Sequence, residues 1–122
     1  MATGRSTPGV ALATESLTPL HYLGVALAVV SGVLHLYLGA LFAPSPLGVS
    51  FLLAGVAFLA GAGAVLVDYR RRLVYLAGVP FTLVQIGAWY VVNAPAFSTL
   101  GIGDKVVQTL FVVVLVALYS RE

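Results

Sequence analysis

The stretch LHYLGVALAVVSGVLHLYLGALF, residues 20–42, decides the fold class of this chain. It is an almost unbroken run of apolar residues, and a helix of this length crosses about 30 Å of hydrocarbon at about 1.5 Å per residue. Thr18 and Pro19 precede it. They suit a helix start, because threonine caps the first N–H groups and proline needs no N–H partner there. The stretch therefore predicts a membrane-spanning helix.

The composition of the whole chain agrees with this prediction. Of its 122 residues, 61% are hydrophobic and only 8% are charged, against about 25% charged residues in soluble domains. Three further apolar runs follow, and Ser45 and Pro46 mark the start of the first of them. The sequence predicts an all-α, polytopic membrane protein, a bundle of four transmembrane helices. The expected spans are at about residues 20–42, 47–67, 73–92 and 104–120.

The fourth span is the least regular. Its apolar run from Val106 to Leu118 would cover only about 20 Å as a helix. We therefore expect the helix to begin at Asp104, an N-cap that follows the glycines of GIG at residues 101–103. On this interpretation residues 93–103 form a long, weakly polar connector.

A polar leader precedes the first span. Residues 1–18 are rich in serine, threonine, glycine and alanine, and they show no sustained apolar period. We expect a flexible N-terminal tail over residues 1–18 and a four-helix transmembrane domain over residues 19–122.

The few basic residues predict the orientation of the bundle. Arg70, Arg71 and Arg72 lie between the second and third spans, and with four spans Arg5 and Arg121 fall on the same side. A single lysine lies on the other side. Because basic residues concentrate on the cytoplasmic side, both termini are predicted to be cytoplasmic, in the cell membrane. The arginine triplet has this topogenic role and is also suited to bind anionic lipid headgroups.

Four polar residues interrupt the apolar spans at similar depths. Along the helices from their cytoplasmic ends, His35 and Asp104 lie about 22 Å away, and Gln85 and Gln108 about 16–18 Å. A polar group that faces a neighbouring helix gains a hydrogen bond that it cannot find in lipid, so we expect a polar intramembrane cluster. Two interpretations stay open. The cluster is either neutral glue between helices, or a His35–Asp104 pair facing a small aqueous vestibule on a proton or ion path.

Small residues share the helix face on which His35 lies. Stepping by three and four residues along the first span gives a helix-packing seam of small side chains: Gly24, Ala28, Ser31, Gly32 and Gly39. Such a seam lets another helix approach closely, so the first span is predicted to be central to the bundle or to an oligomer.

The two histidines also allow a haem alternative. His21 and His35 are fourteen residues apart, on one helix face and about 21 Å from each other. The segment HYLGVALAVVSGVLH resembles the helices of cytochrome b that carry two haem-ligating histidines. A second such helix would have to come from a parallel homodimer, which gives haem b bound by His21 and His35 as an alternative. The competing interpretation of His21 is an interfacial residue in the first turn.

No other chemistry stands out in the sequence. The chain has no cysteine, so it has no thiolate nucleophile and no cysteine-ligated zinc. It has no phosphate-binding loop, nucleophile triad or metal-ligand cluster. We expect no enzyme activity, no catalytic residue, no metal, no cofactor beyond the haem alternative, and no nucleic-acid partner. The expected partners are membrane lipids and either a homo-oligomer or a larger membrane complex.

Three stretches resemble small, uncharacterised four-helix integral membrane proteins of halophilic archaea: residues 32–55 (GVLHLYLGALFAPSPLGVSFLLAG), 67–93 (VDYRRRLVYLAGVPFTLVQIGAWYVVN) and 104–108 (DKVVQ). The resemblance spans about residues 20–122, and it implies fold and habitat without supplying functional residues. With so little extramembrane mass, the chain favours a structural or accessory component of a larger membrane assembly. A proton or small-solute pathway in an oligomer and a haem-carrying homodimer are the alternatives.

Overall fold

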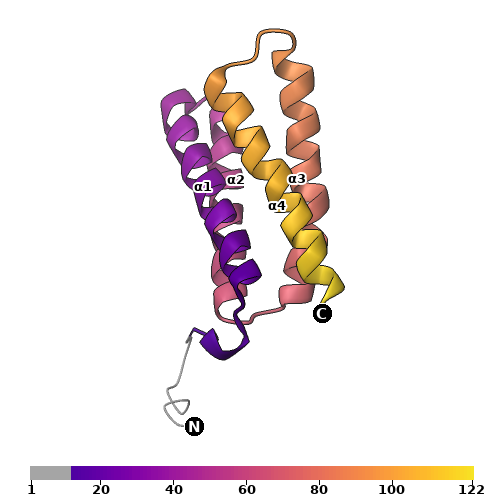
Figure 1. The fold of residues 1–122 in the computed structure, drawn as a ribbon. Helices are drawn as coiled ribbons and strands as arrows, with labels where there is room; N and C mark the ends of the chain where they lie inside the picture. Colours follow the sequence, from indigo (N-terminus) through magenta and orange to yellow (C-terminus); the bar gives the residue numbers. More distant parts are fainter. Residues whose placement is uncertain (1–11) are drawn as a thin grey trace.

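The computed structural model describes residues 12–122 and is all-helical over that range. A short 3-10 turn, η2 (Thr14–Ser16), precedes the four helices α1 (Pro19–Phe42), α2 (Pro46–Leu66), α3 (Arg71–Asn93) and α4 (Thr99–Ser120). The helices run alternately up and down along one bundle (Figure 1). All four are long and apolar enough to cross a membrane. The predicted all-α fold with four membrane-spanning helices is therefore confirmed.

The two ends of the bundle differ in charge. α1 begins and α4 ends at the same end, and the α2–α3 connection with Arg70 lies there too (Figure 1). We call this the basic end. The α1–α2 and α3–α4 connections lie at the other end, which we call the distal end. That the basic end is cytoplasmic stays a prediction.

The first two helices begin where the sequence predicts. Thr18 is the N-cap of α1 and its side chain accepts a hydrogen bond from the backbone of His21. Ser45 caps α2 in the same way through the backbone of Gly48, and proline takes an early position in both helices. Each cap satisfies one of the N–H groups that a helix start leaves without an intrahelical partner.

The prediction that α4 begins at Asp104 is wrong. Ser98 is the N-cap, its Oγ accepts a hydrogen bond of 3.0 Å from the Gly101 backbone, and the helix starts at Thr99. The glycines at 101 and 103 lie inside the helix, and a Cβ at Gly101 would come within 2.7 Å of the Trp89 ring nitrogen. Gly101 therefore serves close packing, and neither glycine ends the helix. As a result Asp104 lies in the second turn, with its side chain free for tertiary contacts.

Part of the predicted tail forms hydrogen bonds with the bundle. The Ala13 backbone N–H donates to the Leu66 carbonyl at 2.8 Å, and an Arg71 guanidinium N–H donates to the Ser16 hydroxyl at 2.8 Å. These bonds connect Ala13 to α2 and Ser16 to α3. That residues 1–18 form a flexible tail stays a prediction. Residues 1–11 lie outside the described residues.

The four helices do not pack equally. α1 packs most extensively on α2 and also contacts α4, while α3 packs mainly on α4 and less closely on α2. Glycines allow the close α1–α2 approach, because a Cβ on Gly55 would lie 2.8 Å from Leu36 and 2.9 Å from the Gly32 carbonyl oxygen. The α2–α3 side is therefore the loosest side of the bundle.

Candidate functional site

The distal half of the bundle contains a group of polar side chains that are buried or half-buried in its interior. They come from three helices: Ser31 and His35 on α1, Gln85 on α3, and Asp104, Lys105 and Gln108 on α4. We call these six residues the distal polar cluster. Counted along the helices, they lie about 8–16 Å from the distal helix ends.

Asp104 joins α1 to α4 at the centre of this cluster. One carboxylate oxygen accepts a hydrogen bond of 2.9 Å from the Ser31 hydroxyl, and the other accepts one of 2.8 Å from the Lys105 ammonium. Lys105 also donates to the Gln108 side-chain oxygen at 2.7 Å. The cation cancels the carboxylate charge where both side chains are largely removed from solvent, which lowers the cost of burying either charge.

Gln108 extends the cluster to α3. Its amide nitrogen lies 3.3 Å from both the Ser31 hydroxyl and the Gln85 side-chain oxygen, and it donates to them. Gln85 in turn donates to the Phe81 carbonyl at 3.2 Å. Gln108 is completely buried, so its hydrogen bonds are made entirely within the protein. These bonds link α1, α3 and α4 through one side chain.

His35 stands at the edge of the cluster and does not bond directly to Asp104. Its Nδ1 lies 2.7 Å from the Ser31 carbonyl oxygen, an acceptor, so Nδ1 carries the proton. The imidazole packs edge-on against Phe51, with ring centroids 5.6 Å apart, and at a tilt against Phe58, at 5.4 Å. Ser31 stands between the two residues, and its hydroxyl donates to the carboxylate. The direct His35–Asp104 pair considered from the sequence is therefore absent.

Sequence reasoning missed two members of the cluster. The sequence pattern places Ser31 in the packing seam, although its position four residues before His35 puts both residues on one helix face. The charge pattern identifies Lys105 only as the one cation on the side of the membrane opposite the arginines. Its spacing of three residues from Gln108 was the available signal that both side chains share a face of α4.

The small-residue seam of α1 is buried throughout, and it faces two different helices. A Cβ on Gly24 would lie 3.2 Å from Val114 of α4. A Cβ on Gly32 would meet Leu59 of α2 at 3.1 Å, and one on Gly39 would meet Leu52 of α2 at 2.7 Å. Ala28 is also buried, in the apolar core. α1 therefore lies between α2 and α4, with small residues at both contacts.

The three arginines of the basic end have different surroundings. Arg71 is buried, donates to the Val65 carbonyl at 2.8 Å and lies 3.5 Å from the exposed carboxylate of Asp68. Arg72 donates to the Tyr119 hydroxyl at 3.2 Å and stacks over its ring at 4.6 Å. Arg70 is exposed. Arg71 therefore stabilises the α2–α3 connection through its bonds to Val65 and Asp68. Arg70 and Arg72 are exposed, so they are available to bind lipid headgroups.

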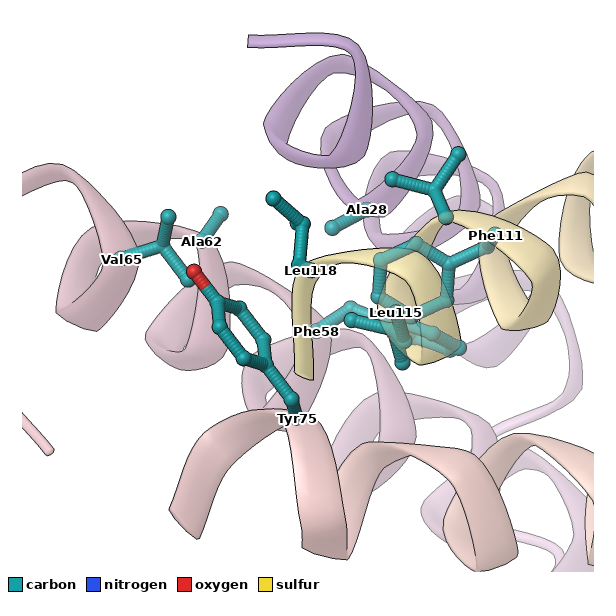
Figure 2. Close-up of a cluster of buried hydrophobic side chains, with 9 residues drawn as sticks. Ala28, Phe58, Ala62, Val65, Tyr75, Phe111, Leu115 and Leu118 are labelled. Atoms are coloured by element: carbon teal, nitrogen blue, oxygen red, sulfur yellow. The ribbon is translucent and has the colours of Figure 1, made fainter. Parts of the chain in front are cut away.

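The basic half of the bundle contains a cavity of about 310 Å³. Phe58, Phe81 and Phe111 separate it from the distal polar cluster, with Phe58 in edge contact with Phe81 at 5.3 Å and with Phe111 at 5.8 Å. Figure 2 shows Tyr75 reaching from α3 across this region toward Ala62 and Val65 of α2. The interior thus has two separate regions along its length.

The histidines do not fit a haem shared between two copies of this chain. Such a haem needs imidazoles on the outer surface of α1, whereas His21 is 7% exposed and His35 6% exposed inside their own bundle. Nδ1 of His21 is also occupied, because it accepts the Thr18 backbone N–H at 3.0 Å in the α1 capping box. Within residues 12–122, no three His, Asp or Glu side chains are grouped closely enough to hold a metal ion.

Comparison with known protein families matches residues 8–119 to a family described as "Family of unknown function (DUF7475)". Neither a search of curated proteins nor a search of solved structures finds a match. The match covers all four helices except the last residue of α4.

Proposed function

The chain belongs to the family of unknown function DUF7475, and from its own geometry we propose that it is a structural or accessory component of a larger membrane assembly, without enzyme activity. The proposal places it in the cell membrane with the basic end in the cytoplasm, because Arg70, Arg72 and Arg121 gather there. The resemblance to small haloarchaeal membrane proteins supports a haloarchaeal source.

The observation that carries this proposal is a pair of surface glycines. Gly63 on α2, Gly87 on α3 and Gly103 on α4 are exposed, and a Cβ added to any of them would meet nothing within 4 Å. The pair on α3 and α4 carries the proposal, because these two helices pack on each other. A helical glycine costs about 0.5–1 kcal/mol relative to alanine, and packing within this chain does not offset that cost here. Small residues on transmembrane helices let a second helix approach closely. A partner helix accounts for both glycines.

The two glycines also lie at matching depths. Gly87 is 16 residues from the start of α3 and Gly103 is 17 residues from the end of α4, so both lie about 25 Å from the basic end. Because α3 and α4 pack on each other, the α3–α4 side in the distal half is the proposed contact surface. The partner is a second copy of the chain or another membrane protein.

The distal polar cluster supports a packing role better than a conduction path. Asp104 and Lys105 form an ion pair at 2.8 Å, and Lys105 donates a second hydrogen bond to the Gln108 side-chain oxygen at 2.7 Å. On the side of the basic end, the aromatic layer of Phe58, Phe81 and Phe111 closes the interior. An ion or a proton crossing the bundle would have to pass this apolar layer.

Site-specific crosslinking in native membranes tests the proposal. The chain has no cysteine, so Gly103→Cys introduces a unique thiol at the proposed surface and Ala40→Cys, exposed on α1, is the matched control. We expect a short photocrosslinker attached to the thiol, which reacts with C–H bonds and needs no cysteine on the partner, to trap position 103 in a product of one defined mass and to leave position 40 as monomer. Equal labelling without any crosslinked product at position 103 would contradict the proposal.

A further inference from the structure

The cavity of the basic half has a composition that packing alone does not explain. All four helices contribute to its wall, and of its seventeen lining residues only His21 and Tyr75 carry a polar side-chain atom. The other lining residues are glycine, alanine, valine, leucine and phenylalanine. At about 310 Å³ the cavity is at the lower end of the volumes of small-molecule sites.

Both polar residues present an atom without a partner. Four buried side-chain nitrogen or oxygen atoms in residues 12–122 lack a hydrogen-bond partner, and two of them are His21 Nε2 and the Tyr75 hydroxyl. Tyr75 is completely buried, and His21 is 7% exposed. Buried polar atoms in folded proteins are nearly always paired. Two such atoms on the wall of one cavity therefore indicate a partner inside the cavity.

The capping box of α1 fixes what His21 offers to that partner. The Thr18 backbone N–H donates to Nδ1 of His21 at 3.0 Å, so Nδ1 is the acceptor and the neutral ring carries its proton on Nε2. His21, a residue of the cavity wall, therefore carries an N–H donor that has no partner within the protein. The Tyr75 hydroxyl can donate or accept. A ligand that satisfies both the His21 N–H and the Tyr75 hydroxyl therefore needs an oxygen atom that accepts hydrogen bonds.

The loosest side of the bundle gives this cavity a route to the bilayer. Ala57 and Gly61 on α2 and Ala77 on α3 line it, and both alanines are exposed on the surface. Of the four neighbouring helix pairs, α2 and α3 also pack least closely. A molecule dissolved in the membrane can thus enter between them. Water alone does not fill the cavity, because its two polar side chains suffice for one ordered water and the rest of its wall is apolar.

We propose that this cavity binds a neutral, bilayer-soluble molecule through an oxygen acceptor, which lies against His21 Nε2 and the Tyr75 hydroxyl. The apolar body of the molecule lies against the aromatic layer of Phe58, Phe81 and Phe111. Quinones and long-chain alcohols share this chemistry, since both combine an apolar body with such an oxygen. The inference does not depend on the assembly role proposed above.

Binding of a matched pair of probes tests the inference in the full chain reconstituted in lipid nanodiscs. Menadione carries quinone oxygens, while methylnaphthalene has the same ring system without them, and the readout is the NMR signal of isotope-labelled His21 imidazole nitrogens. We expect saturable binding of menadione, about tenfold tighter than binding of methylnaphthalene, because only the quinone satisfies the donor. Decanol distinguishes the two candidate ligand classes. A saturable His21 shift with decanol that exceeds the shift with menadione identifies a long-chain alcohol as the ligand, and a larger saturable shift with menadione identifies a quinone. No saturable His21 shift with either oxygen-bearing probe overturns the inference.

Two matched pairs of variants separate binding from folding. Tyr75→Phe removes the buried hydroxyl and is expected to reduce the menadione preference about fivefold, whereas Tyr22→Phe, on the exposed surface of α1, leaves it unchanged. Gly61→Leu places a side chain into the cavity and is expected to abolish saturation, while Gly63→Leu two residues away faces open space and retains it. Menadione binding that is equal in Gly61→Leu and Gly63→Leu would place the probe elsewhere and reject the cavity.

Discussion

The distal and basic halves of this bundle treat buried polar groups in opposite ways. In the distal half, Asp104, Lys105 and Gln108 use one another as partners, with bonds of 2.7–2.9 Å at the ion pair and its neighbours. In the basic half, His21 and Tyr75 leave atoms without partners on the wall of a cavity. Phe58 and its two phenylalanine neighbours separate the halves.

This difference indicates that polar side chains have different roles in the two halves: they hold helices together in the distal half and stay available to a ligand in the basic half. A paired group in a low-dielectric interior fixes which helices lie together, because losing one partner leaves the other group unsatisfied. An unpaired group gives the fold no stability and keeps its capacity for a ligand. Substitutions in the distal half should therefore lower stability, and comparable substitutions at the cavity should not.

The largest effect is expected at the ion pair. Asp104→Asn removes the carboxylate that neutralises Lys105 and leaves a cation largely buried, so we expect a loss of about 3 kcal/mol in the free energy of unfolding. The measurement is denaturant unfolding in bicelles. The double variant Asp104→Asn/Lys105→Met should recover most of this loss. A double variant as unstable as the single one would show that the pair is not the cause.

The next largest effect compares two glycines of α2. Gly55→Ala forces a Cβ to within 2.8 Å of Leu36 and 2.9 Å of the Gly32 carbonyl oxygen, and is expected to cost about 2 kcal/mol of unfolding free energy. Gly61→Ala points a methyl group into the cavity, 3.7 Å from Val74, and is expected to stabilise by about 0.5 kcal/mol through helix propensity. If Gly55→Ala and Gly61→Ala change the unfolding free energy equally in the same assay, the two halves do not differ in packing as proposed.

A smaller effect is expected at the amide that joins three helices. Gln108→Leu removes the hydrogen bonds to Ser31, Gln85 and Lys105, and should lower the unfolding free energy by about 1–1.5 kcal/mol. Gln85→Leu removes a less buried group at the edge of the cluster and should cost about 0.6 kcal/mol. If Gln85→Leu lowers the unfolding free energy more than Gln108→Leu does, Gln108 is not the centre of this hydrogen-bond network.

The smallest effect is expected at Tyr75. Tyr75→Phe removes a hydroxyl that has no partner within the protein, so in the absence of added ligand its unfolding free energy should stay within about 0.5 kcal/mol of the parent. The same unfolding assay measures it. A loss of about 2 kcal/mol would mean that this hydroxyl is bonded within the fold, and the contrast between the halves would disappear.

Much of the fold could be predicted from local sequence alone. Hydropathy over windows of about 20 residues finds spans because a bilayer requires helices of that length, whatever their neighbours. Thr18 and Ser45 mark helix starts through contacts within a single turn. The start of α4 was missed because the glycines at 101 and 103 suggested a break, whereas the Trp89 ring on α3 packs against Gly101. That contact is tertiary and leaves no mark in the local pattern.

The candidate sites divide in the same way. The sequence by itself determined four membrane-spanning helices, the depths of His35, Gln85, Asp104 and Gln108, and the small-residue face of α1, because depth and face follow from residue spacing along a regular helix. Only the tertiary structure decided that Ser31 separates His35 from Asp104, that Lys105 turns inward, and that His21 and Tyr75 border one cavity. These facts depend on which helices are neighbours and how each is rotated about its axis, and the packing of all four helices together sets both.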